Sequence, residues 1–280
     1  RCQLMELNRR IRVTPLQAGE VLTLLSIPLI LAVLYYLTPI SFQNHLVLDH
    51  TNPALHTFWT NSLVHEHKPG DGHLIGNIVG YTILVLPCWA LYIYRNQRQR
   101  FWTGYIILLT LGALAASISS YLAFHEVLGL QIQNDRGFSG VVGAVDGFLV
   151  MTILQTFAQE QEEKVAMLSV GLYFAYLFMG LGALTSRYII LGFGVLALIA
   201  VFAGTRTKYV SHPEQLSDWG YKNRRLSGIL VIAALVSTFA FAAALPAEIT
   251  SSSGGLKNIV AHGAGILFGM TVEVVLRRIN

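Results

Sequence analysis

A serine stands between glycines where a polar loop gives way to an apolar segment. Ser139 lies in the stretch GFSG, residues 137–140. A serine hydroxyl is a poor nucleophile until a nearby base takes its proton. The backbone N–H groups at the start of a helix are free to donate, and flanking glycines allow a substrate backbone to come close. Ser139 is therefore a candidate nucleophile.

Three further polar residues could complete the chemistry of acyl transfer. His262, in the stretch AHGAGILFG, could accept the serine proton. His73 and Asn77 are spaced i, i+4, so they share one helix face and can donate to one point. Preorganised donors of this kind stabilise the oxyanion that forms during acyl transfer.

The elements that carry these residues are predicted to be membrane helices. Hydrophobic residues make up 54% of the 280 residues, charged residues only 12%, and the mean hydropathy is +0.55. A soluble domain has about 25% charged residues, whereas apolar runs of about 20 residues can cross a bilayer. We predict an all-α polytopic membrane helical bundle, a single membrane-embedded domain over residues 1–280. The expected passes are 17–38, 73–94, 102–124, 139–158, 165–184, 187–204, 227–246 and 259–276.

The fifth and sixth passes rest on a split at Thr185, Ser186 and Arg187, which suit a tight hairpin. Lysine and arginine placement predicts the orientation of the whole bundle. With both termini in the cytoplasm, 15 of the 19 basic residues lie on the cytoplasmic side. Ser139 and the other three candidates then share one depth near the external face, where buried polar groups are functional candidates. The basic loops explain the net charge of +4 as contacts to anionic lipid, without nucleic acid.

Other chemistries find little support. Cys2 and Cys88 lie far apart, so neither a disulfide framework nor a metal site follows. The sequence contains neither a P-loop nor a dinucleotide fingerprint, and no cofactor is predicted. We interpret His65, His67 and His125 as loop residues.

Small residues at four-residue steps predict close helix packing. Gly143 and Gly147 follow the candidate serine on one helix, and Gly265 and Gly269 follow the candidate histidine on another. Such faces let membrane helices approach closely. If the two helices touch through them, the serine and the histidine can meet.

Three stretches together resemble the signature of the rhomboid intramembrane serine proteases: HLIGN at 73–77, GFSG at 137–140 and AHGAGILFG at 261–269. The stretch FWTNSLVH at 58–65 also resembles the first external loop of that family. The resemblance covers residues 17–158 and 259–276. It implies a rhomboid-like core with about two extra helices within 165–246.

The resemblance also implies the role of each site residue. Ser139 would be the nucleophile and His262 the general base of a catalytic dyad. His73 and Asn77 would stabilise the oxyanion. The expected activity is that of an intramembrane serine endopeptidase, which cleaves transmembrane segments of single-pass proteins where they unwind near the outer face. The absence of an organelle-targeting segment, rather than the resemblance, predicts a prokaryotic plasma membrane as the location.

This sequence departs from the family pattern at several points. Trp59 is followed by Thr60, where the family often has arginine. Gly143 stands where some members place a tyrosine against the catalytic histidine. Three predicted helices, rather than one, separate the two members of the dyad. The added pair preserves the direction of the histidine helix.

Two other functions are compatible with parts of the sequence. A non-catalytic rhomboid-like protein could bind transmembrane helices as a membrane chaperone, although such relatives lack a dyad member. A transporter could use Asp146 and Glu273 for protons, but no internal repeat is found. Asp146 is expected to have a structural role, with assistance to His262 as the alternative. Glu273 is expected to pair with Arg277, four residues later.

Overall fold

Six long apolar helices dominate the described structure. The computed structural model describes residues 14–67, 70–127, 134–160, 221–244 and 258–279, with six single residues between 175 and 199. Within this part of the chain, six helices are long and apolar enough to cross a membrane. They are α2 (Pro15–Leu37), α5 (Gly72–Tyr94), the composite helix Arg98–Val127, α8 (Ser139–Glu160), α12 (Arg224–Ala244) and α13 (Ile259–Ile279). Their length and composition indicate an integral membrane protein.

Six of the eight predicted passes are confirmed as helices, with ends that agree within a few residues. The two other predicted passes, 165–184 and 187–204, and the hairpin between them lie outside the described ranges.

The composite helix Arg98–Val127 changes from α-helical to π-helical geometry at two places. It consists of α6 (Arg98–Ile107), the π-helical turn η2 (Leu108–Gly112), α7 (Ala113–Tyr121) and a second π-helical stretch η3 (Leu122–Val127).

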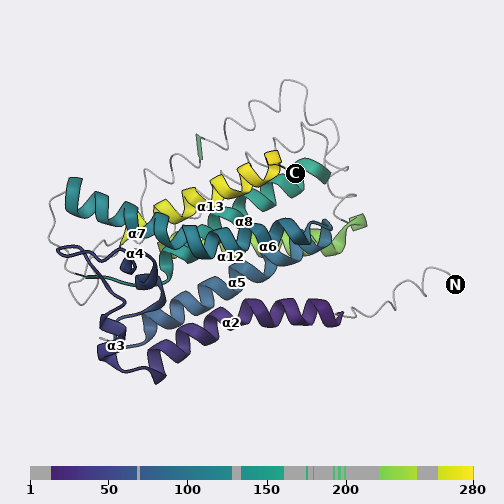
Figure 1. Cartoon of the computed structure of the whole chain (residues 1–280). Helices are drawn as coiled ribbons and strands as arrows, with labels where there is room; N and C mark the ends of the chain where they lie inside the picture. The colour runs from purple at the N-terminus through teal and green to yellow at the C-terminus, as the bar shows by residue number, and fades with distance from the viewer. Residues whose placement is uncertain are drawn as a thin grey trace.

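Short elements cover the end of the bundle at which α5, α8 and α13 begin (Figure 1). They are α3 (Ile40–Asn44), β1 (Leu48–Asp49), α4 (Thr57–Thr60), the 3-10 turn η1 (Asn61–Leu63) and β2 (Asn134–Asp135). β1 and β2 pair antiparallel, with Leu48 opposite Asp135. The start of α2 and the end of α13 lie at the opposite end of the bundle (Figure 1).

Helix α8 occupies the centre of the bundle. Of its apolar stretch, 83% is buried, against 22–39% in the other five helices. It packs against α13, α5 and α12, so the helix that begins at Ser139 has three long helices as neighbours. The outer helices instead expose leucine, isoleucine and valine, as expected for surfaces that face lipid.

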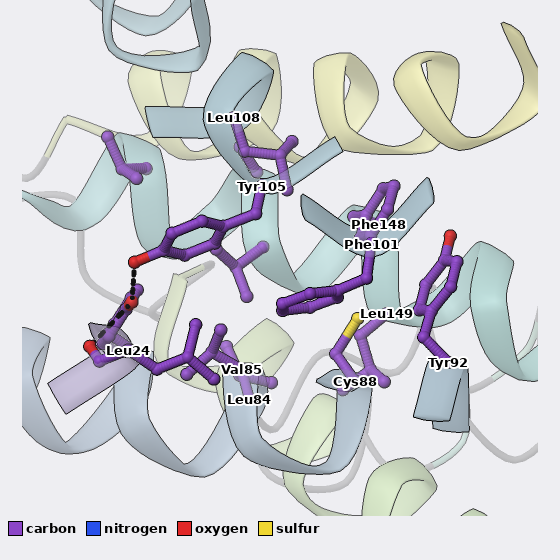
Figure 2. Packing of buried hydrophobic residues seen from close by; sticks show 14 of the residues in the cluster. Leu24, Leu84, Val85, Cys88, Tyr92, Phe101, Tyr105, Leu108, Phe148 and Leu149 are labelled. Carbon is purple, nitrogen blue, oxygen red and sulfur yellow. Dashed lines mark hydrogen bonds between the residues drawn. The ribbon is translucent and has the colours of Figure 1, made fainter. Parts of the chain in front are cut away.

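Aromatic side chains fill the space between α5, α6 and α8 (Figure 2). The rings of Tyr92 and Phe148 stack with centroids 5.5 Å apart. The hydroxyls of Tyr81 and Tyr105 lie 2.6 Å apart, and Tyr81 donates to the carbonyl of Leu24 on α2, as the dashed lines in Figure 2 show. Each buried hydroxyl therefore has a partner, which an apolar environment requires.

Buried charges near the far end of the bundle are paired across helices. Arg100 on α6 lies 2.9 Å from a carboxylate oxygen of Glu273 on α13. Tyr92 donates to the other oxygen of that carboxylate. The predicted pairing of Glu273 with Arg277 is therefore wrong. Glu273 is fully buried, and a buried carboxylate needs a buried partner rather than an exposed neighbour one turn away.

The predicted packing of small residues between α8 and α13 is confirmed. A Cβ at Gly143 would lie 2.8 Å from the carbonyl oxygen of His262. A Cβ at Gly147 would collide with the carbonyl of Ile266, and one at Gly265 with the carbonyl of Gly140. The backbones of the two helices are thus in direct contact, which only glycine allows at these positions.

A methyl group in this contact should destabilise the protein. In Gly269→Ala, the new Cβ would lie 2.8 Å from the backbone nitrogen of Phe148 and closer still to the carbonyl of Ala144. We expect a loss of about 1–3 kcal/mol in the free energy of unfolding, measured by denaturant titration in detergent. Gly263→Ala on the same helix is the matched control, because its Cβ would meet nothing within 4 Å. Equal stability of the two variants would contradict the packing.

Candidate active site

The loop before Ser139 has a backbone shape that requires glycine. Gly137 has φ +131, a conformation that side chains rarely adopt. Its Cα also faces the ring of His73, because a Cβ there would lie 2.8 Å from the ring carbon Cε1. Gly137 therefore brings the start of α8 directly against His73 at the start of α5.

Gly140, on the other side of the serine, is required by packing. A Cβ at Gly140 would collide with the Cβ of Ala116 on α7 and lie 3.6 Å from the carbonyl oxygen of Ala261 on α13. The sequence predicts that the two glycines let a substrate backbone approach. In the structure, the ring of His73 occupies the space beside Gly137, and helices α7 and α13 occupy the space beside Gly140.

His65 lies in a loop, as predicted, but it is buried at the centre of the site, whereas His125 lies on the π-helical stretch η3 and not in a loop. Only 1% of the surface of His65 is exposed. Its Nε2 accepts a hydrogen bond from Asn77 Nδ2 at 2.9 Å and one from the backbone N–H of Phe138 at 3.3 Å. Because Nε2 is an acceptor, the neutral ring carries its proton on Nδ1. The ring thus links α5 to the residue just before Ser139.

Asn61 provides a second link to the same loop. Its carbonyl oxygen accepts from the backbone N–H of Gly137 at 3.0 Å. Its side-chain oxygen accepts from Ser117 on α7, also at 3.0 Å. Asn61 and His65 both belong to the stretch FWTNSLVH, so this stretch orients two consecutive amides of the serine loop.

His262 is held in the tautomer that a general base needs. Its Nδ1 lies 2.7 Å from the carbonyl oxygen of Ala244, the last residue of α12. A carbonyl can only accept, so Nδ1 carries the proton and Nε2 keeps its lone pair. The missing tyrosine at position 143 is also explained. The carbonyl of His262 takes the space beside Gly143, and Ala244 orients the ring instead.

Ser139 is half-buried at the first residue of α8. The neighbouring Gly140 faces Ala261, and Gly143, one turn later, faces His262. Ser139 and His262 therefore lie at the same end of one tightly packed helix pair. Among the described residues, the Ser139 hydroxyl makes no hydrogen bond, so it is not engaged with its own helix.

The other two predicted residues lie beside this pair. His73 is exposed, with its ring against Gly137, and its ring centroid lies 5.4 Å from that of His65. Asn77 is buried with 6% exposure. An amide has two N–H donors, and His65 accepts one donor from Asn77.

Asp146 does not belong to this group of residues. Its carboxylate is 1% exposed and accepts a hydrogen bond from Ser237 on α12 at 2.6 Å. Its described hydrogen bond therefore joins α8 to α12, as a structural role requires. In the part of the chain that the structure describes, no three His, Cys, Asp or Glu side chains come together as metal ligands.

Comparisons with known proteins return no similarity. No protein-family model matches the chain, and neither the curated proteins nor the solved structures give a match.

The burial of His65 predicts a pH-dependent stability. Burial, with a smaller effect of His73, lowers the pKa of His65 from 6.5 to about 3. The unfolded chain therefore binds this proton near pH 6.5, while the folded protein stays neutral to about pH 3. The contribution of neutral His65 to the free energy of unfolding is fully present above pH 6.5. It decreases as the pH falls below 6.5, by about 2 kcal/mol at pH 5.

His65→Gln should remove this part of the pH dependence, because the glutamine oxygen can accept from both Asn77 and Phe138 without titrating. The free energy of unfolding at pH 7 and pH 5 measures it. His125→Gln is the control, since the side chain of His125 on η3 is 40% exposed. If wild type and His65→Gln lose the same stability between the two pH values, His65 is not buried as described.

Proposed function

We propose that this protein is an intramembrane serine protease, with Ser139 as nucleophile and His262 as general base. The observation that carries the proposal is the hydrogen bond from His262 Nδ1 to the Ala244 carbonyl. It leaves Nε2 unprotonated on a helix packed directly against the start of α8. The resemblance of three stretches to the rhomboid signature also supports the proposal.

In the proposed reaction, His262 Nε2 takes the proton of the Ser139 hydroxyl as Oγ attacks the carbonyl carbon of a peptide bond. The tetrahedral intermediate collapses when His262 returns that proton to the leaving nitrogen. The amine product departs and an acyl-serine remains. Water, deprotonated by the same ring, then hydrolyses the ester and regenerates Ser139.

The oxyanion would be stabilised by His73, Asn77 and the backbone N–H of Ser139. His73 is exposed beside Gly137 and can donate from its ring. Asn77 retains one N–H after its bond to His65. The N–H of Phe138 is already taken by His65 and does not contribute. Because these donors are held in place by their neighbours, little reorganisation is required as charge develops.

The position of the site determines the class of substrate. Ser139 lies at the end of a membrane bundle, near the boundary between lipid and water. A peptide bond inside a helix is shielded, so the substrate is a single-pass protein whose transmembrane segment unwinds at that depth. Fifteen of the 19 basic residues would lie in the cytoplasm if both termini do. We therefore propose that the site lies near the external face of the membrane.

A non-catalytic protein that binds transmembrane helices is the second candidate. The observation that favours it is the absence of a hydrogen bond from Ser139 to any described residue. Catalytic hydrogen bonds are often long before substrate binds, so we rank this function below proteolysis.

A serine-reactive fluorophosphonate probe tests the proposed nucleophile. We expect the wild-type protein to be labelled at Ser139, as identified by peptide mass spectrometry, and Ser139→Ala to remain unlabelled. His262→Ala should be labelled at least about a hundredfold more slowly, because the general base is lost. Ser26→Ala is the control, since Ser26 lies on α2 and donates to the carbonyl of Thr23. Labelling of Ser139→Ala at the wild-type rate would refute the assignment.

The oxyanion donors should have a measurable but partial effect. The phosphonyl oxygen of the probe occupies the place of the oxyanion, so the labelling rate reports on these donors. We expect His73→Ala and Asn77→Ala each to slow labelling, by at most about 10²–10³-fold. Rates equal to wild type in both variants would show that neither side chain faces the oxyanion.

A further inference from the structure

A largely buried carboxylate joins three segments beside the site. The side chain of Asp135 on β2 is 16% exposed. One of its oxygens accepts from the hydroxyl of Ser120 on α7 at 2.7 Å and from the amide of Asn258 at 2.8 Å. The buried ring of His50 also lies beside this carboxylate, with its Nε2 3.8 Å from the same oxygen. The proposed reaction uses none of these residues.

Asn258 makes two different connections with one side chain. Its Oδ1 accepts from the backbone N–H of Ala261 at 2.9 Å, which caps the start of α13. Its Nδ2 donates to Asp135 and to the Ser120 hydroxyl. The first turn of α13 is therefore attached to the strand that leads into the serine loop.

Each of the two connected residues lies at the same sequence distance before a member of the proposed catalytic pair. Asp135 precedes Ser139 by four residues, and Asn258 precedes His262 by four.

Asp135 is ionised at neutral pH. Burial raises its pKa, but the polar groups of His50, Ser120 and Asn258 outweigh that effect, so the pKa lies below its ordinary value. A carboxylate can accept from several donors at once, and bonds to an ionised acceptor are stronger than neutral ones. The Asp135–Asn258 bond is therefore a firm attachment rather than a loose surface contact.

We propose that Asp135 is a positioning residue for the catalytic pair, which fixes the first turn of α13, and with it His262, relative to the Ser139 loop through Asn258. This inference rests on the proposed function. It identifies a connection across segments 123 residues apart in the sequence, made where both catalytic helices begin. A displacement of about 1 Å between reacting groups can cost a factor of about 10² in rate, so such a connection has a direct consequence for catalysis.

Exchanging the two side chains tests the proposal. Asn258→Asp keeps an oxygen that caps α13, but it replaces the donor to Asp135 with a second carboxylate. We expect probe labelling of Ser139 to fall at least about tenfold in this variant. In the double variant Asp135→Asn with Asn258→Asp, the new amide nitrogen at 135 can donate to the new carboxylate at 258 and to the Ser120 oxygen, while the Ser120 hydroxyl donates to that carboxylate. The labelling rate should return to within about threefold of wild type.

Asp135→Asn alone retains an acceptor oxygen and should lose less than Asn258→Asp. Asp49→Asn is the matched control, because Asp49 lies on the paired strand and its carboxylate accepts from Thr51 instead. All rates are compared at a temperature where thermal scans show each variant folded. Wild-type labelling in Asn258→Asp, or an exchange variant no better than Asn258→Asp, would overturn the proposal.

A distance measurement separates this proposal from the proposed function. Spin labels at positions 136 and 263, beside the serine loop and on α13, report the relative position of the two segments without any catalysis. The space beside Gly263 is open, so a label fits there. The distance distribution should broaden in Asn258→Asp and narrow again in the exchange variant. If the wild type is not labelled by the probe, the proposed function fails, and the distances alone decide whether Asp135 fixes α13. An unchanged distribution in Asn258→Asp would overturn the positioning role.

Discussion

The direct backbone contact between α8 and α13 is the constraint on which the rest of the structure depends. Without a hydrophobic driving force between helices in lipid, association relies on close packing. Glycines at 143, 147, 265 and 269 remove the side chains that would keep the two backbones apart. Because the serine helix and the histidine helix begin at the same end, this contact brings both catalytic candidates to one place. The site is thus a consequence of how two helices pack.

The polar residues around this contact fix the positions of His262 and of the loop that precedes Ser139. Ala244 fixes the tautomer of His262, while His65 and Asn61 orient consecutive amides of the serine loop. Each of these groups is partly or wholly buried, where an unmet hydrogen bond costs more than in water. The residues that accept hydrogen bonds from the backbone of the serine loop therefore also hold the loop in place. The Ser139 hydroxyl, in contrast, makes no hydrogen bond to a described residue.

The sequence predicted the helices and the close packing well, because hydrophobic length and glycine spacing are local signals. It failed where partners come from distant segments. His65 and Asn258 carried no periodic signal, since their roles arise from contacts with a loop and a strand elsewhere in the chain. Glu273 was assigned to Arg277 by helix spacing, whereas its partner Arg100 lies 173 residues away. A buried charge is satisfied by whatever the fold brings near it, and sequence spacing does not contain that information.

Proteolysis itself is the central claim, and cleavage of a single-pass reporter in liposomes tests it most directly. The reporter should carry glycine or serine in the outer part of its transmembrane segment, where unwinding costs less. Mass spectrometry of the products locates the cut. We predict cleavage within that outer part by the wild-type protein and none by Ser139→Ala. Equal cleavage by the two proteins would contradict the account, and so would stable binding of several such reporters without any product.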